Sequence, residues 1–319
     1  EHLINALADG EFVSGQELGE QLKISRTAIS KHVKALTEIG LDIYSVTGKG
    51  YKLSQPLNLL NQRKIVSALP KSDLIPEVEV HSLIDSTNNY LLRRLPNQLS
   101  QGQVCLAEFQ SAGRGRRGRQ WISPFGSQIY LSMYWNLEQG LSTAMGLSLI
   151  TALAVSDAIY SITNIQVQLK WPNDIYLKGV KLAGILIDLD GQTLEPCHCV
   201  IGIGINLHMP DKSAQQVDQP WTDLQANTAV DIDRNQLAAE LINCLTKRLQ
   251  LHQINGLSDM VDEWQEQDYF YNKDVKLITG QKETIGNCKG INEQGALLLE
   301  VDGNVKAIYG GEVSLRGLL

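Results

Sequence analysis

Apolar residues in the first part of the chain recur with the spacing of short helices. Leu3 and Leu7 lie about one helical turn apart, and the following Gly10 suits a left-handed helix end. Ser14 and Glu17 have the pattern of a capping box, in which side chains satisfy free backbone amides at a helix start. We therefore expect one helix that ends before Gly10 and a second that begins after Ser14.

A third helix is expected after Ser25, because its apolar positions share one face and its polar positions share the other. The outward residues are Arg26, Thr27, Ser30, Lys31 and Lys34. The segment 42–53 then has the pattern of a hairpin that turns at Gly48-Lys49-Gly50, and Lys49 and Lys52 can reach backbone phosphates. Together these elements indicate a winged helix-turn-helix that binds DNA. A helical cap with a solvated basic face is the alternative.

The rest of the chain combines short strands with a few helices. Strands are predicted over 77–83, 103–110, 127–135, 166–171, 181–190 and 199–207. Helices are predicted over 57–69, 88–95, 141–163 and 234–255. These elements do not alternate regularly, so they indicate an α+β arrangement, a mixed sheet with helices on one face. Residues 273–316 have the pattern of further short strands, at 275–278, 282–286, 296–300 and 305–309.

The composition fits a protein of several domains and excludes some classes. A chain of 319 residues has room for about two or three domains. Its 28 Lys and Arg against 35 Asp and Glu leave a net charge of −7, which argues against a histone-like packaging protein but not against a local nucleic-acid contact. The five scattered cysteines favour reduced thiols in the cytoplasm. The stretch 140–163 contains Asp157 and is expected to be a buried helix, not a membrane span.

Residues 113–119 read Gly-Arg-Gly-Arg-Arg-Gly-Arg and place four guanidinium groups within six positions. The glycine spacing resembles dinucleotide- and phosphate-binding loops. However, a strand follows where those loops need a helix, and Arg119-Gln120 replaces the Lys-Ser/Thr of a P-loop. We therefore interpret the segment as a flexible loop that orders around a phosphate or carboxylate. An RNA-binding basic tract is the alternative.

Polar residues and glycines interrupt apolar strands at three further places. Lys170-Trp-Pro-Asn-Asp174 presents an amide and a carboxylate at a strand end, which suits a Mg²⁺ or ribose site or a simple turn. Lys181 stands where an apolar strand begins, so its ammonium group is either held toward a ligand or extended to solvent. Gly202 and Gly204 share one strand face, and their spacing suggests a groove for an extended ligand.

Two more polar segments have ordinary structural explanations. Asp85-Ser-Thr-Asn-Asn89 offers hydroxyls and an amide where a strand meets a helix, and one of these side chains is expected to cap that helix. Cys197-His198-Cys199 has the wrong spacing for a metal site, and the chain offers no second ligand pair. We therefore predict no zinc.

Taken together, these segments resemble bacterial biotin protein ligases of the bifunctional type, which also repress the biotin operon. The matching motifs are Gly-Arg-Gly-Arg-Arg-Gly-Arg (113–119), Lys-Trp-Pro-Asn-Asp (170–174), Lys-Leu-Ala-Gly-Ile-Leu (181–186), Gly-x-Gly-Ile-Asn (202–206) and Gly-Gly-Glu-Val-Ser-Leu-Arg (310–316). The resemblance spans essentially the whole chain. It implies a winged helix over 1–56, a ligase domain related to class II aminoacyl-tRNA synthetases over 57–270, and an SH3-like β-barrel over 271–319.

The resemblance implies a two-step reaction with MgATP. The biotin carboxylate attacks the α-phosphate to form biotinyl-5′-adenylate, which then acylates one lysine of the biotin carboxyl carrier protein of acetyl-CoA carboxylase. The implied catalytic residues are Lys181, Arg116 and Arg114. The implied biotin-binding residues are Ser86, Thr87, Asn88, Gln110, Arg114, Gly115, Arg116, Lys181, Gly184 and Gly204. Around ATP and the adenylate the family places Arg116, Asn173, Asn206, Trp221 and Arg316, with Asp174 as the ligand of Mg²⁺.

The family also implies a cytoplasmic repressor. Its homodimer, promoted by biotinyl-5′-adenylate, binds operator DNA, while the carrier protein competes for the same surface. Three alternatives stay open at this point. A lipoate-type ligase would share the domain ancestry but lack the winged helix. A pure ligand-sensing repressor would not need Lys181, and a ligase with a vestigial winged helix would not bind DNA. No membrane partner is implied.

Overall fold

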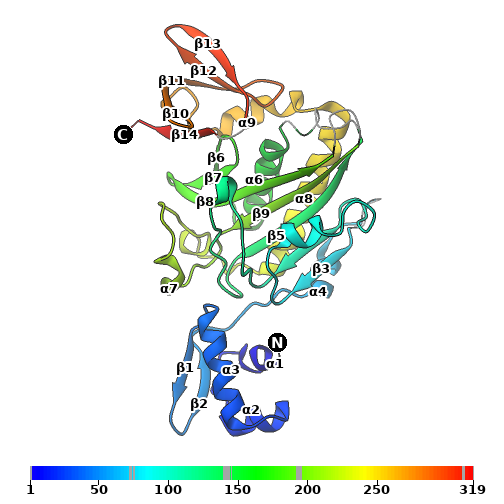
Figure 1. The fold of residues 1–319 in the computed structure, drawn as a ribbon, viewed down its shortest axis with the longest axis vertical. Coiled ribbons are helices and arrows are strands. Elements are labelled where there is room, and N and C mark those ends of the chain that lie inside the picture. Colours follow the sequence, from blue (N-terminus) through cyan, green and yellow to red (C-terminus); the bar gives the residue numbers. More distant parts are fainter. Residues whose placement is uncertain are drawn as a thin grey trace.

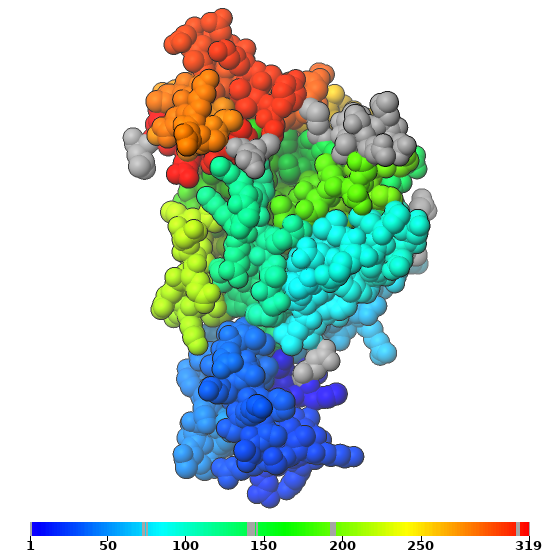
Figure 2. All heavy atoms as spheres, in the orientation of Figure 1, coloured from blue at the N-terminus to red at the C-terminus, as the bar shows by residue number. Residues whose placement is uncertain are grey.

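The computed structural model describes residues 2–71, 74, 76–138, 144, 146–191, 196–310 and 313–318. Three units follow one another along its long axis, with the amino-terminal helices at one end and the carboxy-terminal strands at the other (Figure 1). Each unit contains its own sheet, of two, seven and five strands in chain order. The amino-terminal unit forms a lobe at one end of the larger body (Figure 2).

The amino-terminal unit has the predicted helix-turn-helix and hairpin. Its elements are α1 (His2–Leu7), α2 (Gly15–Leu22), α3 (Arg26–Glu38), β1 (Ile43–Val46) and β2 (Gly50–Leu53). Ser14 Oγ accepts a hydrogen bond from the Glu17 amide at 3.0 Å, and Ser25 Oγ accepts one from the Ala28 amide at 3.1 Å. Both predicted helix starts are therefore confirmed, and a common apolar core packs the helices against the hairpin.

The turn of the hairpin depends on glycine. Gly48 and Gly50 have φ values of +82° and +103°, which side chains with a Cβ rarely adopt. A Cβ on Gly50 would also lie 2.1 Å from Val13 O. Val13 and Tyr51 exchange two backbone hydrogen bonds of 2.9 Å, so the segment before α2 lies against β2. The predicted turn at 48–50 is confirmed.

The central unit is built on a sheet in the order β3-β4-β5-β9-β8-β7-β6. Its strands are β3 (Val78–His81), β4 (Val104–Ala107), β5 (Ile129–Leu137), β6 (Gln168–Lys170), β7 (Asp174–Leu177), β8 (Val180–Asp190) and β9 (Cys197–Ile205). The β3–β4 pair is parallel and the other neighbours are antiparallel, so the sheet is mixed, as predicted. The sequence did not predict β7, because this short strand begins two residues after Pro172, which interrupts the apolar pattern.

The helices of the central unit cover both faces of the sheet, which corrects the prediction that they share one face. The long helices α6 (Leu147–Thr163) and α8 (Arg234–Asn255) pack together over one face. The short helix α5 (Thr87–Leu92) lies on the other face, because Leu91 is buried against Cys105, Tyr134 and Val200. The polar end of α5 therefore lies on the sheet face opposite α6 and α8.

Helix boundaries agree with the sequence prediction to different degrees. The bounds of α8 are those predicted, but α4 (Gln62–Ala68) begins later than the predicted helix 57–69. Asn61 Oδ1 accepts a hydrogen bond from the Lys64 amide at 3.1 Å and caps α4, so the chain before it is extended. For the predicted helix 141–163, residues 141–143 and 145 lie outside the described residues. The short helices α7 (Asp211–Ala214) and α9 (Val261–Gln267) were not predicted.

The carboxy-terminal unit is the expected small β-rich domain. Its antiparallel strands have the order β13-β12-β11-β10-β14. They are β10 (Asp274–Thr279), β11 (Lys282–Ile291), β12 (Leu297–Val301), β13 (Asn304–Ile308) and β14 (Val313–Gly317). β14 was not predicted as a strand. The apolar residues of this sheet join the core of the central unit, so the two units share one hydrophobic core.

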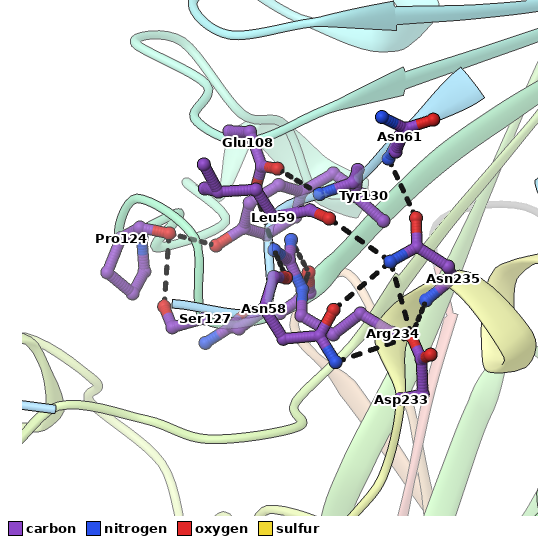
Figure 3. Close-up of polar contacts among 12 residues, drawn as sticks. Asn58, Leu59, Asn61, Glu108, Pro124, Ser127, Tyr130, Asp233, Arg234 and Asn235 are labelled. Atoms are coloured by element: carbon purple, nitrogen blue, oxygen red, sulfur yellow. Dashed lines mark hydrogen bonds and ion pairs between the residues drawn. The ribbon is translucent and has the colours of Figure 1, made fainter. Parts of the chain in front are cut away.

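A buried ion pair of the central unit binds the linker that follows the winged helix (Figure 3). Arg234 Nη1 donates to Glu108 Oε2 at 2.7 Å and to Asn58 O at 2.8 Å. The two charged side chains are only 3% and 4% exposed. The Leu60 amide donates to the other carboxylate oxygen of Glu108. Because both charged groups are shielded from water, their hydrogen bonds to the backbone of Asn58 and Leu60 hold the linker in place.

Asn235 adds a second set of linker contacts at the start of α8 (Figure 3). Its Oδ1 accepts from the Asn61 amide at 2.7 Å, and its Nδ2 donates to Leu59 O at 3.1 Å. On the side of the winged helix, Phe125 from the central unit is buried in the amino-terminal core, and Phe109 packs against that core. The lobe is thus attached by both polar and apolar contacts.

The five cysteines are all buried and free. Cys197 and Cys199 belong to the main core. The intervening His198 is on the other face of β9, where its Nδ1 lies 2.8 Å from the Tyr134 hydroxyl. Within the part of the chain that the structure describes, no helix is long and apolar enough to cross a membrane.

Candidate functional site

Two adjoining cavities lie where the 113–119 loop meets the central sheet. The smaller has a volume of about 60 Å³ and the larger about 300 Å³. The smaller is enclosed by α5, the loop and the middle of β8 and β9, and the larger extends toward the segment 216–221 and β14. Both are lined by Gly115, Arg116, Trp121, Asn173 and Lys181, so these residues stand at the junction of the two cavities.

The smaller cavity brings together all of the residues that the family resemblance assigned to biotin. They are Ser86, Thr87, Asn88, Gln110, Arg114, Gly115, Arg116, Lys181, Gly184 and Gly204. The start of α5 supplies Ser86, Thr87 and Asn88, and Ser86 is the one of the segment 85–89 that caps this helix. The sheet faces α5 at this point, which is why residues far apart in the chain meet here.

Hydrogen bonds order the polar end of the smaller cavity. Gln110 Oε1 accepts from the Thr87 amide at 2.9 Å and from the Thr87 hydroxyl at 3.1 Å. Ser132 Oγ lies 2.7 Å from Thr87 Oγ1 and 2.5 Å from Asn88 Oδ1. Sequence reasoning did not identify Ser132, because a lone serine inside an apolar strand carries no signal. Thr87, Asn88 and Ser132 are buried and Gln110 is partly buried, and these hydrogen bonds hold their side chains in fixed orientations.

Trp121 also lines the smaller cavity, and sequence reasoning did not identify it as a site residue. A Cβ on Gly204 would lie 2.5 Å from its indole, and a Cβ on the paired Gly184 would lie 3.0 Å from it. A Cβ on Gly202 would lie 2.2 Å from Asn88 Oδ1. In this structure the groove that we predicted from glycine spacing is therefore filled by Trp121 and Asn88. The buried Trp121 Nε1 has no hydrogen-bond partner among the described residues.

Lys181 is held at the junction of the cavities by an ion pair. Its Nζ lies 2.6 Å from Asp174 Oδ1, and both side chains are mostly buried. Lys170 Nζ lies 3.9 Å from the same carboxylate and 2.8 Å from the Tyr176 hydroxyl. Burial lowers the pKa of Lys170, against the opposing effect of Asp174, and burial raises the pKa of Tyr176 to about 12. The hairpin of β7 and β8 creates this cluster, because it pairs Asp174 with Gly184 and Tyr176 with Lys181.

The arginine loop closes over the junction with two side-chain contacts. Arg116 Nη1 donates to Asn173 Oδ1 at 2.8 Å, and Arg114 Nη2 lies 2.6 Å from Asp188 Oδ2. Burial lowers the pKa of Arg116, while Asp174 opposes that shift. A short 3₁₀ turn, η1 (Arg116–Gly118), shapes the loop, with Arg117 at φ +60°. The guanidinium groups of Arg114 and Arg116 therefore point toward Asp188 and Asn173.

The larger cavity contains most of the residues expected around the nucleotide. Arg116, Asn173, Asn206 and Trp221 line it. Arg316 does not line it, although its neighbours Val313, Ser314 and Leu315 in β14 do. Arg316 is exposed, and its charge lowers the pKa of Lys170. The third unit thus borders this cavity, but through the strand before Arg316.

The metal prediction concerns Asp174. Among the described residues no group of three or more His, Cys, Asp and Glu side chains lies close enough together to hold a metal ion. The Asp174 carboxylate faces two ammonium groups, which compete with a divalent cation for the same oxygens. The arrangement does not fit a metal ion held by Asp174 alone, and that assignment stays a prediction.

The predicted DNA contacts lie together on the far lobe. Arg26, Thr27, Ser30, Lys31 and Lys34 are exposed on α3, and Lys49 is exposed at the tip of the hairpin. In the described part of the chain none of these basic residues forms an ion pair with a carboxylate. This surface is positively charged and solvated, in contrast to the paired cations at the cavities.

Comparisons with known proteins agree with this division. The family described as "Biotin/lipoate A/B protein ligase family" matches residues 80–206, an "HTH domain" matches 1–52, and a "Biotin protein ligase C terminal domain" matches 270–316. The bifunctional ligase/repressor BirA of Escherichia coli is 48% identical over 98% of this chain and 96% of its own length. That of Bacillus subtilis is 29% identical over 97% and 95%.

A solved structure resembles about three quarters of the chain. The biotin protein ligase from Aquifex aeolicus in complex with biotin and ATP is 28% identical, with a TM-score of 0.65, over 76% of this chain and 99% of that one. The identity to the Escherichia coli protein extends over nearly both full lengths and includes the helix-turn-helix. The chain therefore belongs to the BirA family of bifunctional ligase/repressor proteins.

Proposed function

We propose that this protein activates biotin with ATP and transfers it to a lysine of the biotin carboxyl carrier protein of acetyl-CoA carboxylase. In the first step a carboxylate oxygen of biotin bonds to the α-phosphorus of ATP and pyrophosphate leaves. In the second step the lysine amine attacks the acyl carbon of biotinyl-5′-adenylate, AMP leaves, and the amine loses a proton. Family membership and the structure of a relative with biotin and ATP support this proposal.

The observation that carries the proposal is the junction of the two cavities. Biotin in the smaller cavity and ATP in the larger would bring a carboxylate and a phosphate together beside Lys181, Arg116 and Asn173. Two anions approach each other only where fixed positive charge offsets their repulsion. The Lys181 ammonium and the Arg116 guanidinium supply that charge, and Arg114 adds to it from the loop.

The remaining assignments rest on the same geometry. We propose that Ser86, Thr87, Asn88, Gln110 and the Gly184 and Gly204 backbones hold biotin. Asn173, Asn206 and Trp221 would border the nucleotide, with Arg316 approaching from β14. Because Asp174 already faces Lys181 and Lys170, we propose that Mg²⁺ arrives with the ATP phosphates and draws most of its ligands from them and from water.

Biotin-dependent exchange of labelled pyrophosphate into ATP tests the ligase function. We expect exchange with biotin and none with octanoate or lipoate, followed by labelling of one carrier lysine. Equal exchange with octanoate would favour a lipoate-type ligase instead. No exchange with any acid, together with ligand-dependent DNA binding, would favour a pure sensor.

A second proposed function is repression of the biotin operon from operator DNA, supported by the helix-turn-helix and by the exposed basic residues of α3. We propose that biotinyl-5′-adenylate promotes a homodimer that presents two winged helices to the operator, and that the carrier protein competes for the dimer surface. Sedimentation and DNA binding test this coupling, since the adenylate should raise dimer affinity and operator affinity together. A vestigial winged helix would bind no DNA even at low salt.

We also propose domain limits of 1–56, 57–270 and 271–319, with a cytoplasmic location. The matched family segments, 1–52, 80–206 and 270–316, support the limits. The five free and buried cysteines support a reducing compartment.

A further inference from the structure

Two lysines of the winged-helix hairpin converge on one aromatic ring. The Nζ atoms of Lys49 and Lys52 each lie 5.7 Å from the centroid of the Phe12 ring. Phe12 belongs to the segment between α1 and α2, and its side chain is 39% exposed. At this distance a cation is attracted by the π-electrons of the ring. A single ring therefore restrains both basic side chains of the hairpin.

The backbone explains why Phe12 stands beside these lysines. Val13 and Tyr51 exchange two hydrogen bonds of 2.9 Å, so an antiparallel pairing places Phe12 opposite Lys52. On the other side of β2, Lys52 is paired with Tyr44 of β1. Side chains that are directly opposite share one face of a sheet. Phe12, Lys52 and Tyr44 thus form an outward face, away from the apolar core of the lobe.

The two lysines form no ion pair with the described residues of the lobe. Among the ion pairs of the described residues none includes Lys49 or Lys52, so a carboxylate does not hold either ammonium group. Two like charges on one ring repel each other, and the repulsion would be relieved by a bound anion with two or more negative groups. The sugar–phosphate backbone of DNA presents such groups in series.

We propose that Phe12 is a positioning residue that directs Lys49 and Lys52 toward the phosphates of a DNA duplex. The inference rests on the proposed DNA binding by the winged helix. Free lysine side chains lose rotamer freedom when they bind a phosphate, and a ring that restrains them beforehand reduces that loss. Phe12 carries no charge of its own, so its contribution to phosphate binding passes through the two lysines.

The test compares full-length proteins that carry Phe12→Leu or Phe12→Tyr, with a mixed-sequence DNA duplex as the probe across a range of salt. Leucine keeps an apolar side chain at this half-exposed position, and tyrosine keeps the ring. We expect Phe12→Leu to weaken binding roughly 3- to 10-fold. It should also reduce the slope of log K against log[salt] by up to about 1–2, as fewer phosphates are neutralised. Phe12→Tyr should retain both values.

A double-mutant comparison decides whether the lysines carry the effect. In a Lys49→Met/Lys52→Met background, Phe12→Leu should cause no further loss of duplex affinity. The proposal is overturned if Phe12→Leu weakens binding equally in that background, or if Phe12→Tyr behaves like Phe12→Leu. Biotin-dependent pyrophosphate exchange should be unchanged in every variant, which checks that the chain is folded. If the unmodified protein shows no salt-dependent binding, the proposed repressor function fails, and this inference fails with it.

Discussion

The cations of the winged helix and those of the cavity junction have different surroundings. On α3 and the hairpin, Lys31, Lys34 and Lys49 are exposed and have no carboxylate partner among the described residues. At the cavities, Lys181 lies 2.6 Å from Asp174, and Arg114 lies 2.6 Å from Asp188. Both groups of cations are predicted to meet phosphates. Only the second group is already paired with carboxylates of the protein.

The difference shows how burial determines the use of positive charge. An exposed cation is well hydrated and costs little to leave unpaired, and its attraction for a phosphate is weak and sensitive to salt. A buried cation without a partner would cost several kcal/mol, so the fold supplies a carboxylate or an amide. The site then gains fixed orientation, and a ligand anion has to compete with the internal partner. The following predictions test this contrast.

The largest effect is expected where the pair is most buried. Glu108→Gln removes the charge opposite Arg234, and we expect the free energy of unfolding to fall by about 3–5 kcal/mol, because Arg234 would remain buried without its counter-ion. Urea unfolding measures the change. Glu11→Gln is the matched control, since Glu11 is exposed and its replacement should change stability by less than about 0.5 kcal/mol. Similar losses in the two variants would show that burial does not determine how much a charged group contributes to the free energy of unfolding.

The next effect concerns the junction. Lys181→Met should lower the rate of biotin-dependent pyrophosphate exchange by about 10²–10³, because the charge that stabilises the developing transition state is lost. DNA binding without biotin and ATP should not change. Lys178→Met serves as the control, since Lys178 is exposed in the turn between β7 and β8. An active Lys181→Met enzyme would exclude the role assigned to this lysine.

A smaller effect is expected on the exposed surface. Replacing Lys31 and Lys34 with Ala should lower duplex affinity about 10-fold at low salt. It should also reduce the salt slope by about 1 for each phosphate that the variant no longer neutralises, with pyrophosphate exchange unchanged. Arg63→Ala/Lys64→Ala removes the same charge from exposed positions on α4, outside the winged helix. If both double variants weaken binding equally, overall charge and not the α3 surface governs the affinity.

The smallest effect on stability is expected for the partly exposed pair of Arg114 and Asp188, whose side chains are 38% and 24% exposed. Asp188→Asn should change the free energy of unfolding by only about 0–1 kcal/mol, because solvent already screens the pair. Unfolding at low and high salt measures the difference, which should shrink as salt rises. A loss as large as that of Glu108→Gln would contradict the expectation that an exposed ion pair contributes less to stability than a buried one.

The sequence predicted elements whose signals lie within a few residues of one another. The capping serines Ser14 and Ser25, the turn at Gly48-Lys49-Gly50 and the full extent of α8 follow from local spacing and were confirmed. The start of α4 was misplaced because the cap at Asn61 was not recognised. The strand β7 was missed because four residues after a proline are too few to show a period.

The site was predicted unevenly for the same reason. The residues that the family resemblance assigned to biotin all line one cavity. They could be assigned from the sequence because short contiguous motifs carry most of them. Trp121 and Ser132 were not identified from the sequence, since the residues that they contact in the site are distant along the chain. Arg316 differs from these, because its motif was recognised but its strand presents Val313, Ser314 and Leu315 to the larger cavity, and its assignment stays a prediction.

By itself, therefore, the sequence determined the local elements and the kinds of charge available: a solvated basic face on α3 and a run of arginines after a strand. Only the tertiary structure decided which charges are paired. Glu108 and Arg234 are separated by 126 residues, and Asp174 meets Lys181 only because β7 and β8 form a hairpin. Helix caps and apolar periodicity depend on residues within about one helical turn of each other. Ion pairs and buried faces depend instead on the order of strands in the sheet, which no local pattern contains.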